Sequence, residues 1–545
     1  MNSLFLILIA IIVFLVAYTT YGAWLAKKWG IDPKRPTPAH TRNDGIDYVP
    51  AKAPVLLGHH FSSIAGAGPI VGPIAAAIFG WVPVFLWILV GSVFFGGVHD
   101  MGSLFASVRH DGKSLGEVIE HNMGRRGKLL FAIFAWLTLL LVVAAFTNIC
   151  ANTFVAVPSA ATSSLLFMIL AIGFGFFVYR RGAGLGVSSV IGVVLLFLCI
   201  WLGMKFPLEL SRNTWLIVLL IYIFIASVTP VWILLQPRDY LNSFLLYAML
   251  LGGFLGIVIM HPTLKMSGIT SFKISDGQLL FPMLFVTVAC GAISGFHSLV
   301  GSGTTSKQLD SEKDIKLVGY GSMLIEGVLA TIAIITAGYI GADKLGVLLK
   351  NGGPVNVFSD GLGNFMTSFG LPYTTGKSFT ALAISAFALT SLDTATRLAR
   401  FIFQELFESS KQGKEAQPKP NILTNRFVAT GITVVLGGAL TFKGWTKIWP
   451  LFGSANQLLA ALALLSLAVW LKRSGKEHRM ATIPMVFMFA VTLFALGLLI
   501  KANIGKSTIL LVFAIILMIL SVVLIVEAIK SFRDTPVSKD KSFKA

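Results

Sequence analysis

Long apolar runs separated by short polar segments follow one another along almost the whole chain. A helix needs about 20 mainly apolar residues to cross a bilayer. Runs of about this length predict fifteen transmembrane helices, at residues 3–25, 58–80, 81–108, 128–151, 161–178, 188–204, 214–235, 240–262, 280–303, 317–342, 378–403, 427–441, 446–470, 480–500 and 508–530. The first run is predicted to be retained, because no small-residue cleavage site follows it. The pattern therefore indicates an all-α polytopic membrane protein.

The basic residues divide the loops between these runs into two sets. Of the 43 Lys and Arg residues, 32 lie in the loops that follow odd-numbered runs, and the other 11 lie in the loops that follow even-numbered runs. Since basic loops stay in the cytoplasm, the N-terminus is predicted outside and the C-terminus inside, with 27–52 and 530–545 as cytoplasmic anchors. Topology thus explains the net charge of +19 without a nucleic-acid partner. The expected partners are a small-molecule substrate and membrane lipids, and the oligomeric state stays open.

The composition excludes a water-soluble enzyme, because 55% of the residues are hydrophobic and 12% are charged, against about 25% charged in soluble domains. The three cysteines lie inside apolar runs and predict neither disulfides nor a metal centre. Three Gly-Lys-Ser triplets lack the earlier glycine of a phosphate-binding loop. Transport would therefore draw its energy from an ion gradient or from an external partner.

Glycine and proline cluster in the second run, in GHHFSSIAGAGPIVGP at 58–73. Each proline lacks an N–H and clashes with the preceding turn, so this stretch predicts a broken helix. A broken helix is tolerated at membrane depth where it lines a polar cavity or is buried in protein. The ninth run carries the similar segment GFHSLVGSG at 295–303, and residues 63–68 align with 298–303 without a gap. The two runs cross in opposite directions, as expected for an inverted repeat of a secondary transporter, although close helix packing by small residues is the alternative.

Ionisable residues at membrane depth point to a pathway or a relay. His99 and Asp100 are adjacent in the third run, where a histidine beside a carboxylate could take up and release a proton. A structural pair is the alternative. Asp393, in TSLDTATRLAR at 390–400, has hydroxyls around it, which suits a coupling ion, while an i,i+4 ion pair with Arg397 is the alternative.

The remaining polar residues in the apolar runs are expected to be structural or to serve a gate. Glu326 is expected to form a structural hydrogen bond, with a histidine of a facing helix as a candidate partner, and residues 454–457 are expected to interrupt the thirteenth helix. A metal site built from His59, His60, His99 and His297 is chemically possible, but the spacing matches no metal motif. The residues predicted to be structural or gating are His59, His60, Glu326, Asn456 and Gln457.

Four strings together resemble the carbon starvation protein A family: 58–73, 96–119 (GGVHDMGSLFASVRHDGKSLGEVI), 390–400 and 452–460 (FGSANQLLA). The resemblance spans about residues 1–530. It implies an inner-membrane uptake transporter for peptides or, in some members, for pyruvate with proton coupling. It also implies the amino acid-polyamine-organocation fold, whose core is two inverted five-helix repeats with a broken first helix in each.

This resemblance predicts one transporter domain over 1–545. Its parts would be an extra helix and loop (1–57), the first repeat (58–204), two inserted helices (205–279), the second repeat (280–471), and two helices with a basic tail (472–545). It also places a sodium site of related transporters at 65–68 and 391–394. Asp393 departs from the neutral hydroxyl pattern there, which favours H+ over Na+.

The sequence therefore predicts an alternating-access symporter, not an enzyme and without a cofactor or metal, in a bacterial or archaeal inner membrane. Helix dipoles and N–H groups at the breaks would hold a substrate carboxylate. Peptides are the first choice, with pyruvate as the alternative, and a membrane-embedded metabolite sensor is the rival from another class. The predicted substrate-binding residues are Ser62, Ser63, Gly66, Gly68, His297, Ser298, Gly301 and Ser302, and the predicted ion-coupling residues are Asp393, Ser391, Thr394, His99, Asp100 and Ala65.

Overall fold

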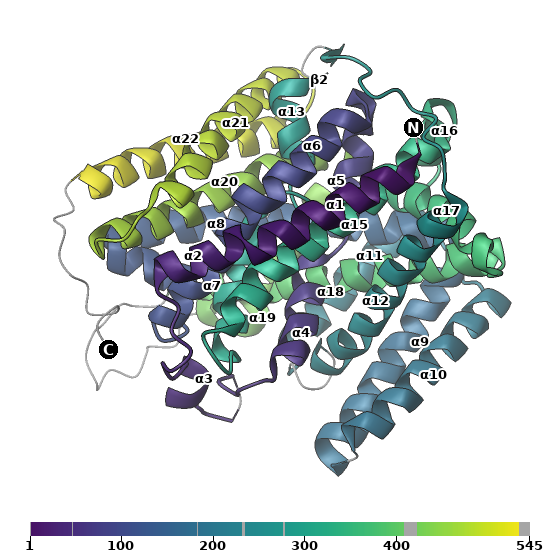
Figure 1. Ribbon diagram of the computed structural model, residues 1–545, viewed down its shortest axis with the longest axis horizontal. Coiled ribbons are helices and arrows are strands. Elements are labelled where there is room, and N and C mark those ends of the chain that lie inside the picture. Colours follow the sequence, from purple (N-terminus) through teal and green to yellow (C-terminus); the bar gives the residue numbers. More distant parts are fainter. Residues whose placement is uncertain are drawn as a thin grey trace.

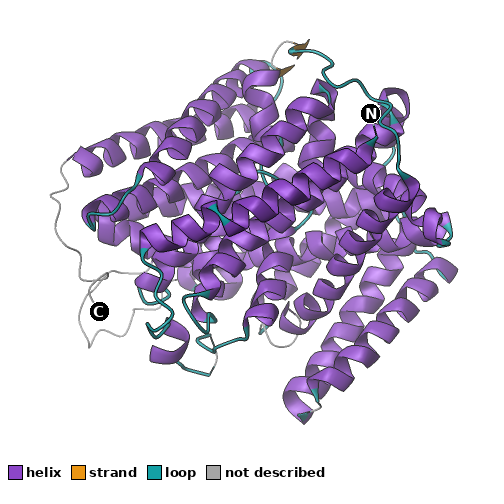
Figure 2. Cartoon of the chain, viewed as in Figure 1, coloured by secondary structure: helices purple, strands orange, loops and turns teal. Residues whose placement is uncertain are grey.

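Helices make up almost all of the described chain (Figure 2). The structure is a computed structural model that describes residues 2–45, 47–182, 184–230, 235–275, 278–407 and 422–533. The α-helices are α1 (Ser3–Thr19), α2 (Tyr21–Trp29), α3 (Pro38–Thr41), α4 (Ala53–Ala65), α5 (Gly68–Ala76), α6 (Trp81–Gly91), α7 (Gly97–Arg109), α8 (Leu115–Ala156), α9 (Pro158–Gly175), α10 (Leu185–Lys205), α11 (Arg212–Val228), α12 (Leu235–Met260), α13 (Leu280–Thr287), α14 (Gly295–Gly303), α15 (Ser322–Ile340), α16 (Ala342–Lys350), α17 (Gly353–Met366), α18 (Tyr373–Phe407), α19 (Arg426–Thr441), α20 (Trp445–Arg473), α21 (Arg479–Asn503) and α22 (Thr508–Arg533).

Short 3-10 and π segments extend or join several of these helices, and two short strands pair antiparallel. These elements are η1 (Ala77–Phe79), η2 (Ser92–Gly96), η3 (Phe176–Arg180), η4 (Thr305–Lys307), η5 (Lys316–Gly321), η6 (Thr367–Phe369), η7 (Ile422–Thr424), β1 (Lys273–Ser275) and β2 (Gln278–Leu279). Parts of the predicted cytoplasmic segments, 408–421 and 534–545, lie outside the described residues.

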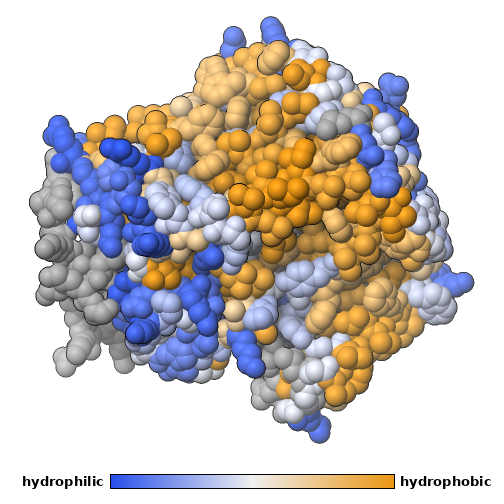
Figure 3. Space-filling model, viewed as in Figure 1, coloured by the Kyte–Doolittle hydropathy of each residue, from blue (hydrophilic) through white to orange (hydrophobic). Residues whose placement is uncertain are grey.

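The apolar runs of the sequence appear as membrane-length helices. In the described residues, eleven helices are long and apolar enough to cross a membrane, or up to twelve if the bent pair α4–α5 is one span. The predicted runs 214–235 and 427–441 appear as the shorter apolar helices α11 and α19, and 280–303 appears as the separate helices α13 and α14. The count of fifteen crossings therefore stays a prediction. Apolar side chains cover the middle of the visible face, with hydrophilic ones towards its ends (Figure 3).

Three predicted segments differ from the sequence interpretation. The loop expected before α18 instead contains the helices α16 and α17, and α17 is largely buried. The helix predicted at 128–151 begins earlier, at Leu115, and bends at Gly124, whose φ is +79°. The interruption expected in the thirteenth helix is wrong, because α20 runs unbroken through Pro450 and Ser454. The Ser454 hydroxyl donates to the Pro450 carbonyl at 2.8 Å, within the continuing helix.

The loops gather at two opposite ends of the helices, and α1 runs between them (Figure 1). At one end, the segment after α2 meets the segment after α14, and the end of α20 meets α8, through the contacts Ala51–Leu309, Thr37–Leu309 and Arg473–His121. At the other end, the contacts are Ser3–Pro262, Lys265–Gly338 and Thr270–Phe79. Loops that the basic-residue pattern assigns to one side therefore lie together. Which end faces the cytoplasm stays a prediction.

Two helices are broken within the core. The first break separates α4 from α5 with a bend of 43°, at Gly66, whose φ of +44° is a conformation that favours glycine. The second break is the non-helical segment 288–294 between α13 and α14. The gapless alignment of 63–68 with 298–303 would place this break at Gly301, which is wrong, because α14 is helical through Gly301.

Gly295, the first glycine of the second segment, serves close packing instead of a break. A Cβ at Gly295 would lie 2.3 Å from the Asn456 carbonyl oxygen, so only glycine lets α14 approach α20 this closely. The same holds for Gly453 of α20, where a Cβ would lie 2.0 Å from the Val286 carbonyl oxygen of α13.

Replacing Gly453 by alanine is therefore expected to destabilise the protein by about 1–3 kcal/mol, because the added methyl group forces α13 and α20 apart. Thermal unfolding in detergent measures the change. Gly497→Ala on α21 is the matched control, since no described atom lies within 4 Å of a Cβ there, and it is expected to be neutral or slightly stabilising. An equal melting temperature for the two variants would contradict the predicted contact.

Candidate functional site

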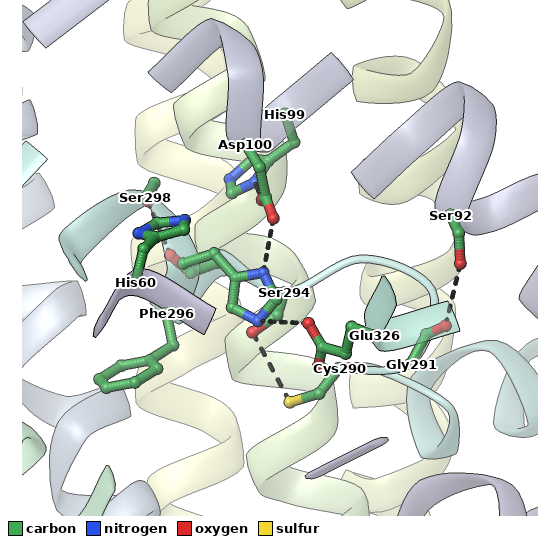
Figure 4. A network of polar contacts seen from close by, with 12 residues as sticks. His60, Ser92, His99, Asp100, Cys290, Gly291, Ser294, Phe296, Ser298 and Glu326 are labelled. Carbon is green, nitrogen blue, oxygen red and sulfur yellow. Dashed lines mark hydrogen bonds and ion pairs between the residues drawn. The ribbon is translucent and has the colours of Figure 1, made fainter. Parts of the chain in front are cut away.

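Four buried ionisable side chains connect α7, α14 and α15 (Figure 4). Asp100 Oδ1 lies 2.7 Å from His99 Nδ1, and Asp100 Oδ2 lies 2.8 Å from His297 Nδ1. On its other side, His297 Nε2 lies 3.4 Å from Glu326 Oε2. All four residues are at most 4% exposed. We call these four residues the histidine–carboxylate chain; it contains the predicted His99–Asp100 pair and the histidine partner expected for Glu326.

His297 lies between two carboxyl groups, Asp100 on one side and Glu326 on the other. An imidazole offers two donors only when it is protonated; in its neutral form one nitrogen donates and the other accepts. The contact with Asp100 is a hydrogen bond, whereas His297 Nε2 and the Glu326 oxygens form none among the described residues. The arrangement places an imidazole between two carboxyl groups at membrane depth, which is a geometry in which a proton could be exchanged.

The two histidines of α4 lie beside this chain without being part of it. His60 Nδ1 is 2.8 Å from the Thr305 hydroxyl of η4, and a Cβ at Gly301 would be 4.0 Å from the His60 ring. The His59 carbonyl accepts from the hydroxyls of Ser62 and Ser63. The described residues contain no group of three His, Cys, Asp or Glu side chains placed to hold a metal ion.

The polar pair of α20 serves the second break. The Asn456 side chain accepts from the Phe296 N–H at 2.9 Å and donates to the Ser294 hydroxyl at 3.0 Å, so it caps the first turn of α14. Gln457 donates to the Phe285 carbonyl, and the Trp449 indole donates to the Thr287 carbonyl at 3.2 Å. A broken helix leaves such terminal groups unpaired, so α20 stabilises this break. Of the two roles predicted for these amides, the contacts fit helix packing.

The first break lies against α18, at the position predicted for an ion site. A Cβ at Gly66 would be 2.5 Å from the Ser391 hydroxyl, and one at Gly68 would be 2.5 Å from the Cys290 sulfur. The first break is thus in contact both with α18 and with the second break.

The carboxylate of α18 has a partner that the sequence analysis did not identify. Asp393 Oδ2 accepts from the guanidinium of Arg238 on α12 and, at 2.7 Å, from the hydroxyl of Tyr222 on α11. The predicted i,i+4 pair with Arg397 is wrong, because Arg397 donates to the Ala226 and Thr229 carbonyls at the end of α11. Carbonyls at a helix C-terminus attract a cation, which explains why Arg397 turns there.

Most predicted substrate hydroxyls bond within their own helices. Ser298 donates to the Gly295 carbonyl, and Ser302 donates to the Ser298 carbonyl and accepts from the Leu115 N–H. Ser62 and Ser63 do likewise in α4. His297 belongs to the histidine–carboxylate chain. Among the predicted residues, the structure brings together Gly66 and Ser391, and His99, Asp100 and His297.

A second buried ion pair, also missed in the sequence, ties the loops together at one end. Arg109, the last residue of α7, contacts both carboxylate oxygens of Glu312 at 2.8 and 2.9 Å. Arg109 also donates to the Gly30 carbonyl, and the Asp32 N–H donates to Glu312 at 2.9 Å. We call these contacts the end network. In the sequence, both charged residues look like ordinary loop residues.

The chain as a whole is similar to known proteins. A model of the family "Carbon starvation protein CstA" matches residues 2–349 and 341–495. The chain belongs to this family. Three relatives are similar over most of their lengths: a peptide transporter CstA of Campylobacter jejuni (34% identity, 90% of this chain and 80% of the relative), a pyruvate/proton symporter BtsT of Escherichia coli (32%, 91% and 81%) and a peptide transporter CstA of Bacillus subtilis (31%, 98% and 97%). The chain is accordingly a multi-pass membrane transporter and not an enzyme.

A solved structure of the same overall fold is a manganese transporter of Eremococcus coleocola. It is 12% identical, with a TM-score of 0.53, and the match covers 91% of this chain and 99% of that one. At this identity the likeness concerns the fold alone. The architecture of a CstA-family chain is therefore shared with a transporter of very different sequence.

Proposed function

We propose that this CstA-family chain is a proton-coupled symporter that brings small carboxylate-bearing nutrients into the cell, with peptides as the first candidate and pyruvate as the second. We place it in the inner membrane of a bacterium or archaeon, with the N-terminus outside and the C-terminus in the cytoplasm. The names of its relatives support both substrate classes, and the distribution of basic residues supports the orientation.

The observation that carries proton coupling is the histidine–carboxylate chain. Ionisable groups are costly at membrane depth, so those that occur there usually mark a functional site. Four of them contact one another in a row here, from His99 through Asp100 and His297 to Glu326. Asp100 and His297 join α7 to α14, which directly follows the second break. A change in the proton content of the chain would alter the contacts that hold these helices together, and so would link protonation to movement.

The two broken helices support the transporter architecture. They begin the segments 58–204 and 280–471, which we propose to be inverted five-helix repeats, with substrate between α4, α5, α14 and α18. Because the serine hydroxyls of α4 and α14 are bonded internally, the backbone groups at Gly66, Gly68 and the second break are the proposed contacts there. Na+ between 65–68 and 391–394 remains the alternative coupling ion.

Purified protein in liposomes tests this proposal. An imposed inward proton gradient is expected to accumulate labelled pyruvate or labelled dialanine above the level reached without a gradient, and a sodium gradient at equal pH on both sides is expected not to. Empty liposomes correct for leakage. Accumulation driven only by sodium would contradict proton coupling, and saturable binding without any flux would favour the metabolite sensor.

A further inference from the structure

The buried arginine of α12 has the chemistry of a carboxylate-binding site. Arg238 is 1% exposed, and its guanidinium contacts Asp393, Asp239 at 3.2 Å and the Tyr222 hydroxyl at 2.7 Å. Arginine presents a rigid fork of donors that suits carboxylates. We propose that Arg238 binds the carboxylate of the transported substrate, and that Asp393 occupies this position while no substrate is bound. This inference rests on the proposed function, because it names the substrate's anchor.

Several polar atoms around this pair have no hydrogen-bond partner among the described residues. They are Arg238 Nε, Asp393 Oδ1, Ser391 Oγ and Asn242 Oδ1, and all four residues are at most 1% exposed. Buried polar groups without partners are costly, and each calls for an explanation. The set contains a cationic donor, a hydroxyl and two acceptors, which together can bind an anion that also carries a carbonyl or an amide.

The location suits a transport pathway. Ser391, the side chain that a Cβ at Gly66 would meet, is two residues before Asp393 on α18, so the first break and Asp393 are within one turn of each other along that helix. Helix α4 also packs against both α12 and α18. A ligand at Arg238 would therefore be within reach of the segment whose irregular backbone is expected to move.

Exchange of one carboxylate for another keeps the charge of this region constant. When the substrate carboxylate pairs with Arg238, Asp393 loses its cation, and a carboxylate at membrane depth then needs a proton. One proton enters with one substrate carboxylate, and the sum of charges is unchanged. The groups that face Asp393 are Arg238 and Asp239 of α12, Tyr222 of α11, Cys150 of α8 and, on its own helix, Arg397.

The proposal specifies the ligand class. Both pyruvate and a dipeptide end in a carboxylate, and both are expected to bind better than the counterparts in which an amide replaces that carboxylate, pyruvamide and dialanine amide. An amide that replaced Asp393 at the guanidinium would bring no charge, and would leave Asp239 as the one carboxylate in contact with Arg238 among the described residues. The preference for the acid over the amide therefore reports on Arg238, whereas overall affinity also includes contacts elsewhere.

Equilibrium binding of labelled pyruvate and labelled dialanine to the purified full-length protein, with the amides as competitors, tests the proposal. The double variant Arg238→Gln with Asp393→Asn removes both charges of the pair, so that no unpaired carboxylate is left at position 393. Gel filtration and thermal unfolding establish that it is folded. It is expected to lose the preference for acid over amide, a change on the order of 100-fold. The control is Arg397→Gln: this arginine also faces Asp393, but its hydrogen bonds in the described part of the chain go to backbone carbonyls. It is expected to retain the preference.

Asp393→Asn alone separates this proposal from a purely structural ion pair. This variant removes the Asp393 carboxylate, which competes with the substrate for Arg238. The substrate carboxylate is therefore expected to bind about tenfold more tightly, although proton-coupled uptake is lost. A structural pair predicts weaker or unchanged binding. The proposal is overturned if Asp393→Asn does not bind more tightly, if the double variant keeps its preference, or if the unmodified protein shows none. Because binding is measured without a gradient, a failure of proton coupling in liposomes would leave this result intact.

Discussion

Replacing Asp100 by asparagine is expected to lower proton-driven uptake by a factor of roughly 100 or more. Asp100 accepts from both His99 and His297. Two charge-assisted hydrogen bonds are each worth about 1.5–3 kcal/mol, and even the lower value for both corresponds to about 100-fold. Asparagine keeps the shape but not the charge that lets a protonated imidazole remain buried. The initial rate of uptake into liposomes under an imposed proton gradient is the measurement.

Asp360→Asn is the matched control for this variant. Asp360 of α17 is also a buried carboxylate, and it contacts Lys344 at 3.1 Å and Tyr373 at 2.6 Å, outside the histidine–carboxylate chain. It is expected to retain coupled uptake, even if it melts earlier. Gradient-driven uptake that is equal in the Asp100 and Asp360 variants would rule out a coupling role for the chain.

The sequence was sufficient to locate the helices because membrane burial imposes a simple pattern. A run of twenty apolar residues is compatible with few structures other than a membrane-spanning helix. Loops that share a set in the basic-residue pattern are in contact at each end, as in Ala51–Leu309 and Ser3–Pro262. The pattern fails for α16 and α17, which are short and mixed in composition. It also fails for the thirteenth helix, where Gly453 looks like a break but provides close contact with the Val286 carbonyl.

The members of the histidine–carboxylate chain were visible in the sequence, but their arrangement was not. Any charge inside an apolar run stands out, so His99, Asp100, His297 and Glu326 were all identified. Asp100 and His297 are 197 residues apart, and only the packing of α7 against α14 brings them together. No local spacing rule covers such a contact.

Arg238 shows why its ion pair with Asp393 was missed. It lies in the predicted loop between the runs 214–235 and 240–262, where a basic residue was assigned to the membrane surface. In the structure, α12 begins at Leu235, and Arg238 is buried within it. Asp393 was identified, but the nearest sequence partner, Arg397, was not the true one. Arg109 and Glu312 were hidden in the same way, since charges in loops are usually solvated.

The end network yields the second large effect: Arg109→Met is expected to destabilise the protein by about 3–5 kcal/mol. Among the described residues, the variant leaves Arg35, at 3.8 Å, as the cationic neighbour of the buried Glu312 carboxylate. Removing one partner of a buried pair costs more than the pair contributes, because the other charge stays desolvated. Unfolding in mixed detergent micelles measures the loss.

Two further variants separate this explanation from a general sensitivity of the loops. Arg42→Met removes an arginine whose pair with Asp111 is exposed, with side chains 51% and 57% accessible, so a change of at most about 1 kcal/mol is expected. Adding Glu312→Gln to Arg109→Met removes the stranded charge and is expected to recover part of the stability. If the double variant is less stable than Arg109→Met by the full cost of a second independent mutation, the two residues are not coupled. Coupling would instead mean that the segments after α2, α7 and α14 are held together by one buried ion pair, whose two charges stabilise this end of the protein only in each other's presence.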